Sequence, residues 1–193
     1  VPGDMSLRLS EGQTVRDCLT PMGITSENVA SDFGIGRQEQ DEFALRSYNR
    51  ALEAQKKGYF NDEIVPIKTT VKDKEGKKQK VTVSQDEGPR PTTIENLGKL
   101  KPAFKPDGHS HAGNSSQTTD GAAAVVLAKR STAERLGLPI LGVFRGFKVV
   151  GVAPRVMGIG PAVAIPAVLK QVGMTTDDVD IFELNEAFAS QAV

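Results

Sequence analysis

The sequence predicts an α/β fold, in which helices cover sheets built largely from parallel strands. Three observations support this prediction. The run from Val179 to Leu184 is almost continuously apolar, which is typical of a strand buried on both faces. After about Gly121, apolar strand-like and helix-like segments alternate, whereas the sequence before it is polar and rich in turn residues. Residues 37–57 have the apolar spacing of a long amphipathic helix.

The first part of the chain is predicted to carry that helix and one hairpin. One face of the helix, from Arg37 to Lys57, collects Phe43, Ala44, Ser47, Ala51 and Ala54, and Gly58 is a typical stop signal. Asp62 to Thr70 and Lys80 to Ser84 are predicted strands on either side of a charged turn at residues 72–77. We interpret the lysine-rich tip of this hairpin as a solvated charge cluster.

The second part is predicted to alternate between strands and helices. Ala122 to Ala128 and Ile140 to Val150 have strand composition, and a short helix from Ser131 to Leu136, capped by Ser131, is expected between them. Pro161 to Val172 is predicted to be a helix with proline in its first turn.

A polar pair follows the last apolar run. Asn185 would lie at the carboxyl end of the predicted strand, where open α/β sheets bind their ligands, and Glu186 to Val193 would open a helix. Alternatively, Asn185 caps that helix. The local pattern leaves both possibilities open.

Composition excludes several classes of function. The 193 residues contain 24 basic and 24 acidic side chains, so no general attraction to nucleic acid or to anionic membranes is expected. The single cysteine argues against an oxidising compartment. We expect no membrane span, because no apolar run approaches ~20 residues. The first residues lack the apolar core of a signal peptide, but the chain starts without an initiator methionine, so a targeting segment before Val1 stays open.

Other motifs are incomplete. The sequence from Gly158 to Pro161 begins like a dinucleotide loop, but proline removes a phosphate-binding N–H and the third glycine is missing. His109 and His111 flank one serine, yet no cysteine or further histidine completes a metal site, so we expect both on an exposed loop. No Gly-x-Ser-x-Gly elbow of a serine hydrolase is present.

Eight ordered segments resemble the thiolase family and together run over essentially the whole chain. They read PMGITSENVA, RQEQDEFALRS, DEIVPI, DEGPRPT, LKPAFKPDG, AGNSSQTTDGAAAVVLAKRS, GVAPRVMGIGPAVAIP and NEAFASQA. RDCLTPMGITSENVA and LGLPILGVF are most similar to the peroxisomal 3-ketoacyl-CoA branch of the family. The resemblance implies thiolytic cleavage of a 3-ketoacyl-CoA to acetyl-CoA and a shortened acyl-CoA in fatty-acid β-oxidation. It implies coenzyme A (CoA) as a substrate and no other cofactor.

The resemblance also implies a domain organisation. Residues 1–116 would be the loop domain, a CoA-binding excursion that contains the small hairpin. Residues 117–139 would be the last strand and helix of the N-terminal thiolase half, and residues 140–193 the start of the C-terminal half. Each half would be incomplete, so strands such as Ala122 to Ala128 would lack some of their neighbours. The full-length protein would be a homodimer, with a peroxisomal location favoured over a mitochondrial or cytoplasmic one, and without nucleic-acid or membrane partners.

Thiolysis needs groups that this sequence does not contain. A thiolase uses a nucleophilic cysteine near its amino terminus, a Gly-His-Pro motif and a second reactive cysteine, and none of the three is present. Cys18 lies beside Asp17, whose carboxylate disfavours a thiolate, so we interpret Cys18 as an ordinary reduced thiol. We therefore predict that this chain is the middle of a thiolase and is inactive alone. The alternative is a non-catalytic acyl-CoA-binding or structural fragment.

The resemblance assigns roles to individual residues. Asn185 would hold a water that helps to stabilise the thioester oxyanion, and Arg90 would contact CoA. Six further residues would surround the substrate: Phe104, Ala112 and Ser116 along the pantetheine channel, Met22 and Met157 near the acyl pocket, and Phe188 in the Asn-Glu-Ala-Phe motif. Without the resemblance, Arg90 would be interpreted as a surface residue, Phe104 and Ser116 as core and turn residues, and both methionines as core packing.

Overall fold

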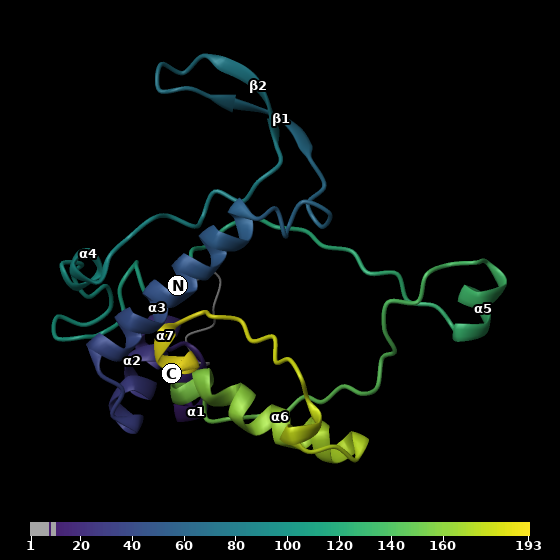
Figure 1. Cartoon of the computed structure of the whole chain (residues 1–193). Helices are drawn as coiled ribbons and strands as arrows, with labels where there is room; N and C mark the ends of the chain where they lie inside the picture. The colour runs from purple at the N-terminus through teal and green to yellow at the C-terminus, as the bar shows by residue number, and fades with distance from the viewer. Residues whose placement is uncertain (1–7, 9–10) are drawn as a thin grey trace.

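The computed structural model describes residue 8 and residues 11–193. Within these ranges the chain consists of helices, long extended connections and one hairpin (Figure 1). The elements in chain order are α1 (Gln13–Cys18), α2 (Met22–Phe33), α3 (Arg37–Lys56), β1 (Ile67–Lys72), β2 (Lys78–Val83), α4 (Ile94–Gly98), α5 (Arg130–Arg135), η2 (Pro154–Ile159), α6 (Gly160–Val172), η3 (Thr176–Asp178) and α7 (Ala189–Ala192). The mixed composition of helix and sheet agrees with the predicted α/β class.

Helix α3 confirms the strongest helical prediction. The side chain of Glu39 accepts a hydrogen bond from the Gly36 N–H at 2.9 Å, which satisfies a donor that the helix leaves free at its start. The helix ends at Lys56, and Gly58 follows with φ of 73°, a conformation that glycine adopts without the strain of a Cβ.

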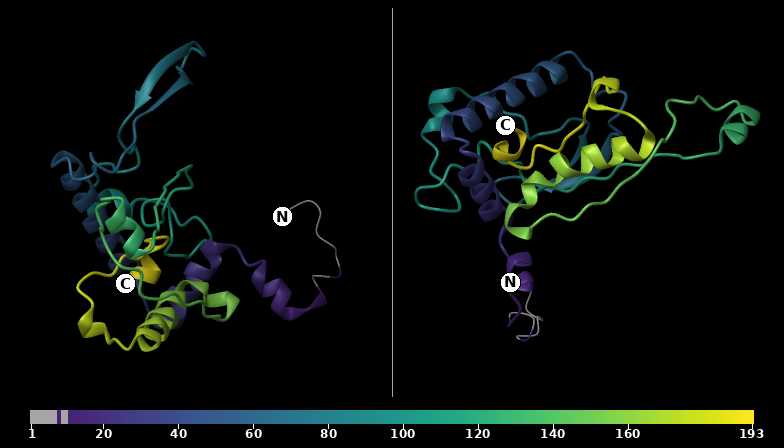
Figure 2. Two further views of the ribbon diagram at one scale, coloured as in Figure 1. Left: turned by 90° about the vertical axis from the view of Figure 1, so that its right-hand side faces the viewer. Right: turned by 90° about the horizontal axis from the view of Figure 1, so that it is seen from below.

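A helical cluster forms the compact part of the molecule. Helix α2 packs against η2 and α7, and α3 packs against α4 and α7, as two further views show (Figure 2). Its most buried apolar side chains come from all of these elements: Val29, Ala30, Ala44, Leu97, Val156 and Ala189. At the edge of the cluster, Asp32 of α2 forms an ion pair with Arg155 of η2, and the Asn28 amide donates to the Arg155 carbonyl at 3.0 Å. These contacts fix η2 to α2, although the two elements are far apart in sequence.

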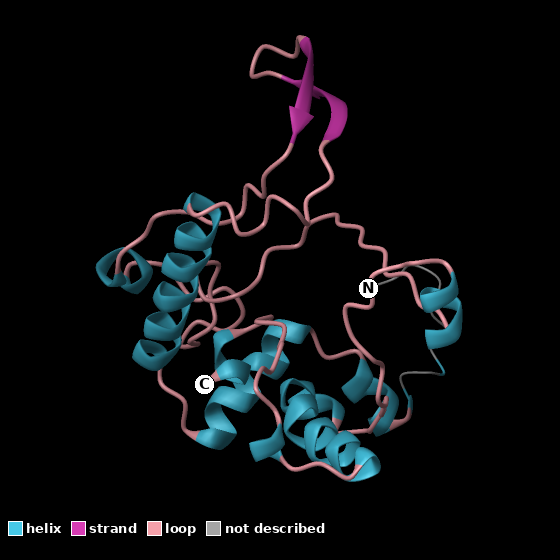
Figure 3. Ribbon diagram, turned by 45° about the vertical axis from the view of Figure 1, so that its right-hand side comes forward, coloured by secondary structure: helices cyan, strands magenta, loops and turns pink. Residues whose placement is uncertain are grey.

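The predicted hairpin is present and projects from the helical cluster (Figure 3). Strands β1 and β2 are antiparallel, in register from Ile67 opposite Val83 to Lys72 opposite Lys78. The Asp73 carboxylate accepts from the Lys77 N–H at 2.9 Å and so closes the turn. The first strand begins later than predicted, because residues 59–63 continue from α3 as a series of turns. The lysines at the hairpin tip are exposed, which agrees with their interpretation as a solvated charge cluster.

Three predicted strands do not form. Residues 122–128, 140–150 and 179–184 are extended but have no regular structure, and they expose large apolar side chains such as Leu141 (98% exposed) and Val126 (87%). The physical reason is the lack of pairing. A strand is stabilised by backbone hydrogen bonds to a neighbour, and within residues 11–193 the only sheet is the hairpin. Asn185 therefore does not follow a strand in this structure.

The predicted helices of the second part form, with different bounds. Helix α5 starts at Arg130, and its N-cap is Lys129 without a side-chain cap, so the predicted cap by Ser131 is wrong. Helix α5 lies apart from the cluster at the end of two extended segments (Figure 1). Helix α6 has a proline in its first turn, as predicted. The last helix begins at Ala189 instead of Glu186, because the residues before it pair with another loop.

Candidate functional site

A cavity of about 800 Å³ opens between α3, two loops and the segment before α7. It gathers four of the residues that the sequence analysis placed around CoA or the reacting carbonyl: Arg90, Ala112, Ser116 and Asn185. Phe104, Phe188, Met22 and Met157 do not line it. The structure thus separates the predicted site residues into a cavity group and a group outside it.

One wall of the cavity is the predicted small-residue face of α3. Phe43, Ala44, Ser47 and Ala51 line it together with Tyr48. The same face continues to Ala54 in an adjoining cavity of about 400 Å³. Since these side chains are short apart from the two aromatic ones, they leave room beside the helix.

The opposite wall is built by pairing two distant segments. The Ser116 N–H donates to the Ala187 carbonyl at 2.9 Å, and the Ala189 N–H donates to the Asn114 carbonyl at 3.0 Å. Between these bonds, Ser115 and Phe188 form an isolated antiparallel bridge. This pairing brings Ser116 and Asn185 to the same cavity.

Asn185 is exposed and lines this cavity. The N-cap of α7 is Phe188, without a side-chain cap, so the interpretation of Asn185 as a helix cap is wrong. The neighbouring Glu186 carboxylate accepts a hydrogen bond from the Ser47 hydroxyl and ties this segment to α3. Met157, expected near the acyl pocket, lies in η2 and is absent from the lining.

Arg90 provides the positive charge of the cavity wall. It is exposed between Pro89 and Pro91, and within the described part of the chain its guanidinium has no hydrogen-bond or ion-pair partner. Proline restricts the backbone on both sides. The guanidinium is therefore available for an anion such as a phosphate, which it can bind through two parallel N–H donors.

The aromatic residues outside the cavity group form a pair near the start of α2. The rings of Phe104 and Phe188 meet edge to face, with centroids 6.1 Å apart. The Phe104 ring also lies on Gly23, where an added Cβ would stand 2.2 Å from it. Met22 is the residue before this glycine, and both Met22 and Met157 are exposed, which argues against the alternative that they are core packing.

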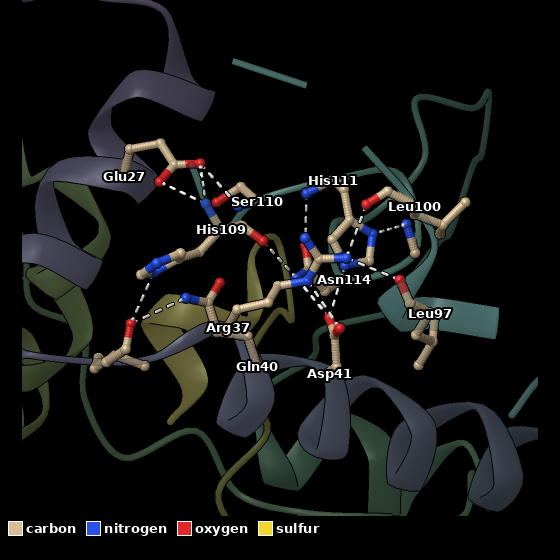
Figure 4. A network of polar contacts seen from close by, with 12 residues as sticks. Glu27, Arg37, Gln40, Asp41, Leu97, Leu100, His109, Ser110, His111 and Asn114 are labelled. Atoms are coloured by element: carbon tan, nitrogen blue, oxygen red, sulfur yellow. Dashed lines mark hydrogen bonds and ion pairs between the residues drawn. The ribbon is translucent and has the colours of Figure 1, made fainter. Parts of the chain in front are cut away.

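A buried polar network holds the cavity loop to α3 (Figure 4). Asp41 is its centre. One oxygen of its carboxylate accepts from His111 Nε2 at 2.6 Å and from Asn114 Nδ2 at 3.1 Å, and the other accepts from Arg37 Nε at 2.8 Å. Arg37 also donates to the carbonyls of Leu97 and Leu100 at 2.8 and 2.9 Å. The network thus connects α3, α4 and the loop.

A second carboxylate holds the beginning of the same loop. Glu27 of α2 accepts from the Ser110 N–H at 2.7 Å and from the His109 N–H at 3.0 Å. A Cβ at Gly108 would lie 2.5 Å from this carboxylate, so a side chain there would displace it. Nearby, the Ser26 hydroxyl bonds to those of Ser110 and Ser190 at 2.7 Å each. The loop is fixed from both sides before it reaches the cavity.

The expectation that both histidines lie on an exposed loop is wrong. His111 is fully buried, and His109 is half-buried with its Nδ1 donating to the Ile35 carbonyl at 3.2 Å. The pattern missed them because their partners lie far away in sequence: Asp41 on α3 for His111, and the Ile35 carbonyl between α2 and α3 for His109. The only local signal of the network was the spacing of Arg37 and Asp41, four residues apart, which allows an ion pair on one helix face.

Burial lowers the pKa of His111, and the neighbouring Asp41 opposes this effect by favouring the charged ring.

Among residue 8 and residues 11–193, no group of three or more His, Cys, Asp or Glu side chains could hold a metal ion. Cys18 is an exposed free thiol in α1 and does not line the cavity. None of the helices in the described ranges is long and apolar enough to cross a membrane.

Known proteins resemble this chain over its whole length. The family profile described as "Thiolase, N-terminal domain" matches residues 6–131, and "Thiolase, C-terminal domain" matches residues 138–193. The chain is 65% identical over all 193 residues to 3-ketoacyl-CoA thiolase A, peroxisomal, from Mus musculus, of which it covers 46%. It is 64% identical over 192 residues to the peroxisomal enzyme of Homo sapiens, of which it covers 45%. The chain thus spans about half the length of these relatives.

Solved structures give the same result. The dimeric peroxisomal thiolase of Saccharomyces cerevisiae superposes with a TM-score of 0.89 at 49% identity, over 100% of this chain and 48% of that one. Human mitochondrial 3-ketoacyl-CoA thiolase gives a TM-score of 0.82 at 45% identity, over 89% of this chain and 42% of that one. Sequence and fold lead to one conclusion: the chain belongs to the thiolase family.

Proposed function

We propose that the full-length protein carrying this segment cleaves 3-ketoacyl-CoA thiolytically, releasing acetyl-CoA and a shortened acyl-CoA in fatty-acid β-oxidation. The observation that carries this proposal is the 65% identity with a peroxisomal 3-ketoacyl-CoA thiolase, which continues over all 193 residues. The mouse and human relatives are peroxisomal, so we place the protein in the peroxisome, with mitochondria or cytoplasm as the alternatives. We propose a homodimer, in line with the dimeric yeast neighbour.

The cavity and the residues beside it would provide contacts for CoA. Arg90 would bind a phosphate through charge-assisted hydrogen bonds. The loop backbone at Ala112 and the Ser116 hydroxyl would line the pantetheine arm, beside the small residues of α3. The pair of Phe104 and Phe188 would lie along the channel, and exposed Met22 and Met157 would adapt to the acyl chain. No further cofactor is needed, because the chemistry is thiolate attack on a ketone followed by cleavage of the carbon–carbon bond.

Asn185 would act on the reacting carbonyl. Its amide can donate to a water that stabilises the oxyanion of the thioester, a task for which a fixed donor is worth about 2.7–4 kcal/mol. The nucleophile would come from outside these 193 residues, because the only cysteine, Cys18, does not line the cavity, and the base would come from the Gly-His-Pro motif that this sequence lacks. This observation supports a second candidate for the isolated chain, namely a segment that binds acyl-CoA without turnover.

One assay tests both candidates. The full-length protein and the 193-residue chain are each incubated with acetoacetyl-CoA and free CoA, and the loss of the ketothioester is followed. We expect turnover only from the full-length protein. Absence of turnover in a folded full-length protein would refute thiolysis, and turnover by the chain alone that Cys18→Ala abolishes would refute the need for other segments.

A further inference from the structure

One wall of the cavity depends on a buried histidine. The loop of residues 108–116 carries Ala112 and Ser116, and His111 stands in its middle with no exposed surface. Burial of a polar ring is costly unless each of its polar atoms has a partner. Both ring nitrogens of His111 have one.

The partners fix the protonation state of the ring. Nδ1 accepts a hydrogen bond from the Gly113 N–H at 3.0 Å, so it cannot carry a proton. Nε2 lies 2.6 Å from an oxygen of Asp41, to which it donates. His111 is therefore a neutral imidazole with its proton on Nε2. One nitrogen anchors the ring to α3, and the other closes the turn that begins the cavity wall.

The turn at Gly113 is closely packed, so it has little room to adopt another conformation. A Cβ at Gly113 would lie 2.6 Å from the Leu97 side chain and 2.7 Å from that of Leu100, so the turn is pressed against α4. The backbone N–H of His111 donates to the Asn114 side chain at 2.8 Å, and the amide of Asn114 in turn donates to Asp41 at 3.1 Å. Displacement of the imidazole would therefore disturb Gly113 and Asn114 together.

We propose that His111 is a positioning residue for CoA, which holds residues 112–116 in place as a neutral ring and releases them when Nδ1 is protonated. The inference rests on the proposed function, because it takes CoA as the ligand of the cavity. A proton on Nδ1 would turn an acceptor into a donor that faces the Gly113 N–H. Two donors cannot form a hydrogen bond, so the turn would open and the wall that carries Ser116 would move.

The charges around the ring define the direction of the pH effect. Asp41 favours a protonated ring, whereas burial and the charge of Arg37 oppose it, and burial is the largest of these effects, so the pKa falls below the ordinary value of 6.5. Unfolded or displaced His111 therefore takes up a proton more readily than the ring in place. The hydrogen-bonded position of the His111 ring is fully stable above the ordinary pKa of histidine. This stability is lost as the pH falls below the ordinary pKa and through the lowered one.

Two substitutions separate the two contacts. His111→Asn keeps an acceptor near the position of Nδ1, and His111→Gln keeps a donor near the position of Nε2, while His111→Ala removes both. CoA affinity of the full-length protein is measured by calorimetry between about pH 8 and about pH 5.5, the range in which a histidine titrates. We expect His111→Ala to weaken CoA binding about tenfold or more. His111→Asn and His111→Gln should each bind CoA more tightly than His111→Ala. In all three variants, CoA affinity should no longer fall as the pH is lowered.

His109→Asn is the matched control. It keeps a donor for the Ile35 carbonyl, and it should leave both the affinity and its pH dependence unchanged. Wild-type affinity in His111→Ala, or an unchanged pH dependence in all three variants, would overturn the proposal.

A second measurement tests the role of His111 even if the proposed function is wrong. If the wild-type protein does not bind CoA, the proposed ligand is wrong, and amide hydrogen exchange then tests His111 alone. Faster exchange at Ser116 and Ala189 in His111→Asn or His111→Gln than in the control would support the positioning role, and equal exchange would overturn it.

Discussion

Removal of the Glu27 carboxylate should destabilise the protein more than any change at an exposed acidic residue. Glu27 is 5% exposed and accepts from two backbone N–H groups. In Glu27→Ala the Ser110 N–H, in a residue that is 1% exposed, would have no acceptor, and the half-buried His109 N–H would lose its own. An unsatisfied buried donor costs about 1–3 kcal/mol. Since only one of the two donors is fully buried, we expect a loss of about 2–4 kcal/mol in the free energy of unfolding.

Urea unfolding of the full-length protein measures this loss as a shift of the midpoint at constant slope. Glu27→Gln is the matched control for size, because its amide oxygen still accepts one bond, and we expect a loss about half as large. Glu42→Ala, on the exposed face of α3, should change the free energy by less than about 0.5 kcal/mol. A midpoint for Glu27→Ala equal to that of Glu42→Ala would refute the view that this carboxylate holds the loop.

The other predictions concern the cavity. Arg90→Ala should weaken CoA binding about tenfold or more, because a charge-assisted bond to phosphate contributes about 1.5–3 kcal/mol. Its urea midpoint should stay unchanged, since the side chain is exposed, and Arg135→Ala on α5 is the control; unchanged affinity in calorimetry would exclude Arg90 from the site. Asn185→Ala should lower kcat about 10²-fold or more with little change in stability. A destabilised but fully active Asn185→Ala enzyme would show that the residue is structural.

The elements that could be predicted from sequence are those with local causes. Helix α3 follows from the spacing of its small side chains and from the glycine that ends it. The hairpin follows from a charged turn between two β-branched runs, and Asp73 closes that turn with its own carboxylate. Helix α6 follows from Pro161 at its start and Gly173 at its end, where φ is 71°. In each case, the residues that decide the structure lie within the element or next to it.

The polar network could not be predicted because its partners are distant. His111 and Asp41 are 70 residues apart, and Glu27 lies 83 residues from Ser110. In sequence, a charged residue in an amphipathic helix is normally exposed, and a histidine between polar residues is normally in a loop. Only the fold shows that the buried groups of His111, Asp41 and Glu27 have partners, and this pairing lowers the energetic cost of burying them.

The missing strands have a different explanation. It also distinguishes the proposed binding residues from Asn185. Residues 122–128, 140–150 and 179–184 have the composition of buried strands, but a strand needs a neighbour, and the chain spans about half the length of its relatives. The loop on the proposed CoA side of the cavity does not depend on them. The loop that carries Ala112 and Ser116 is held to α2 and α3 by Glu27 and Asp41, whereas Asn185 follows an exposed segment and is fixed through Glu186 and the bonds of residues 187–189, one of which also holds Ser116. Under the proposed function, binding and catalysis should therefore separate: we expect CoA affinity to depend on Arg90 and this loop, and kcat to depend on Asn185 once its strand is paired.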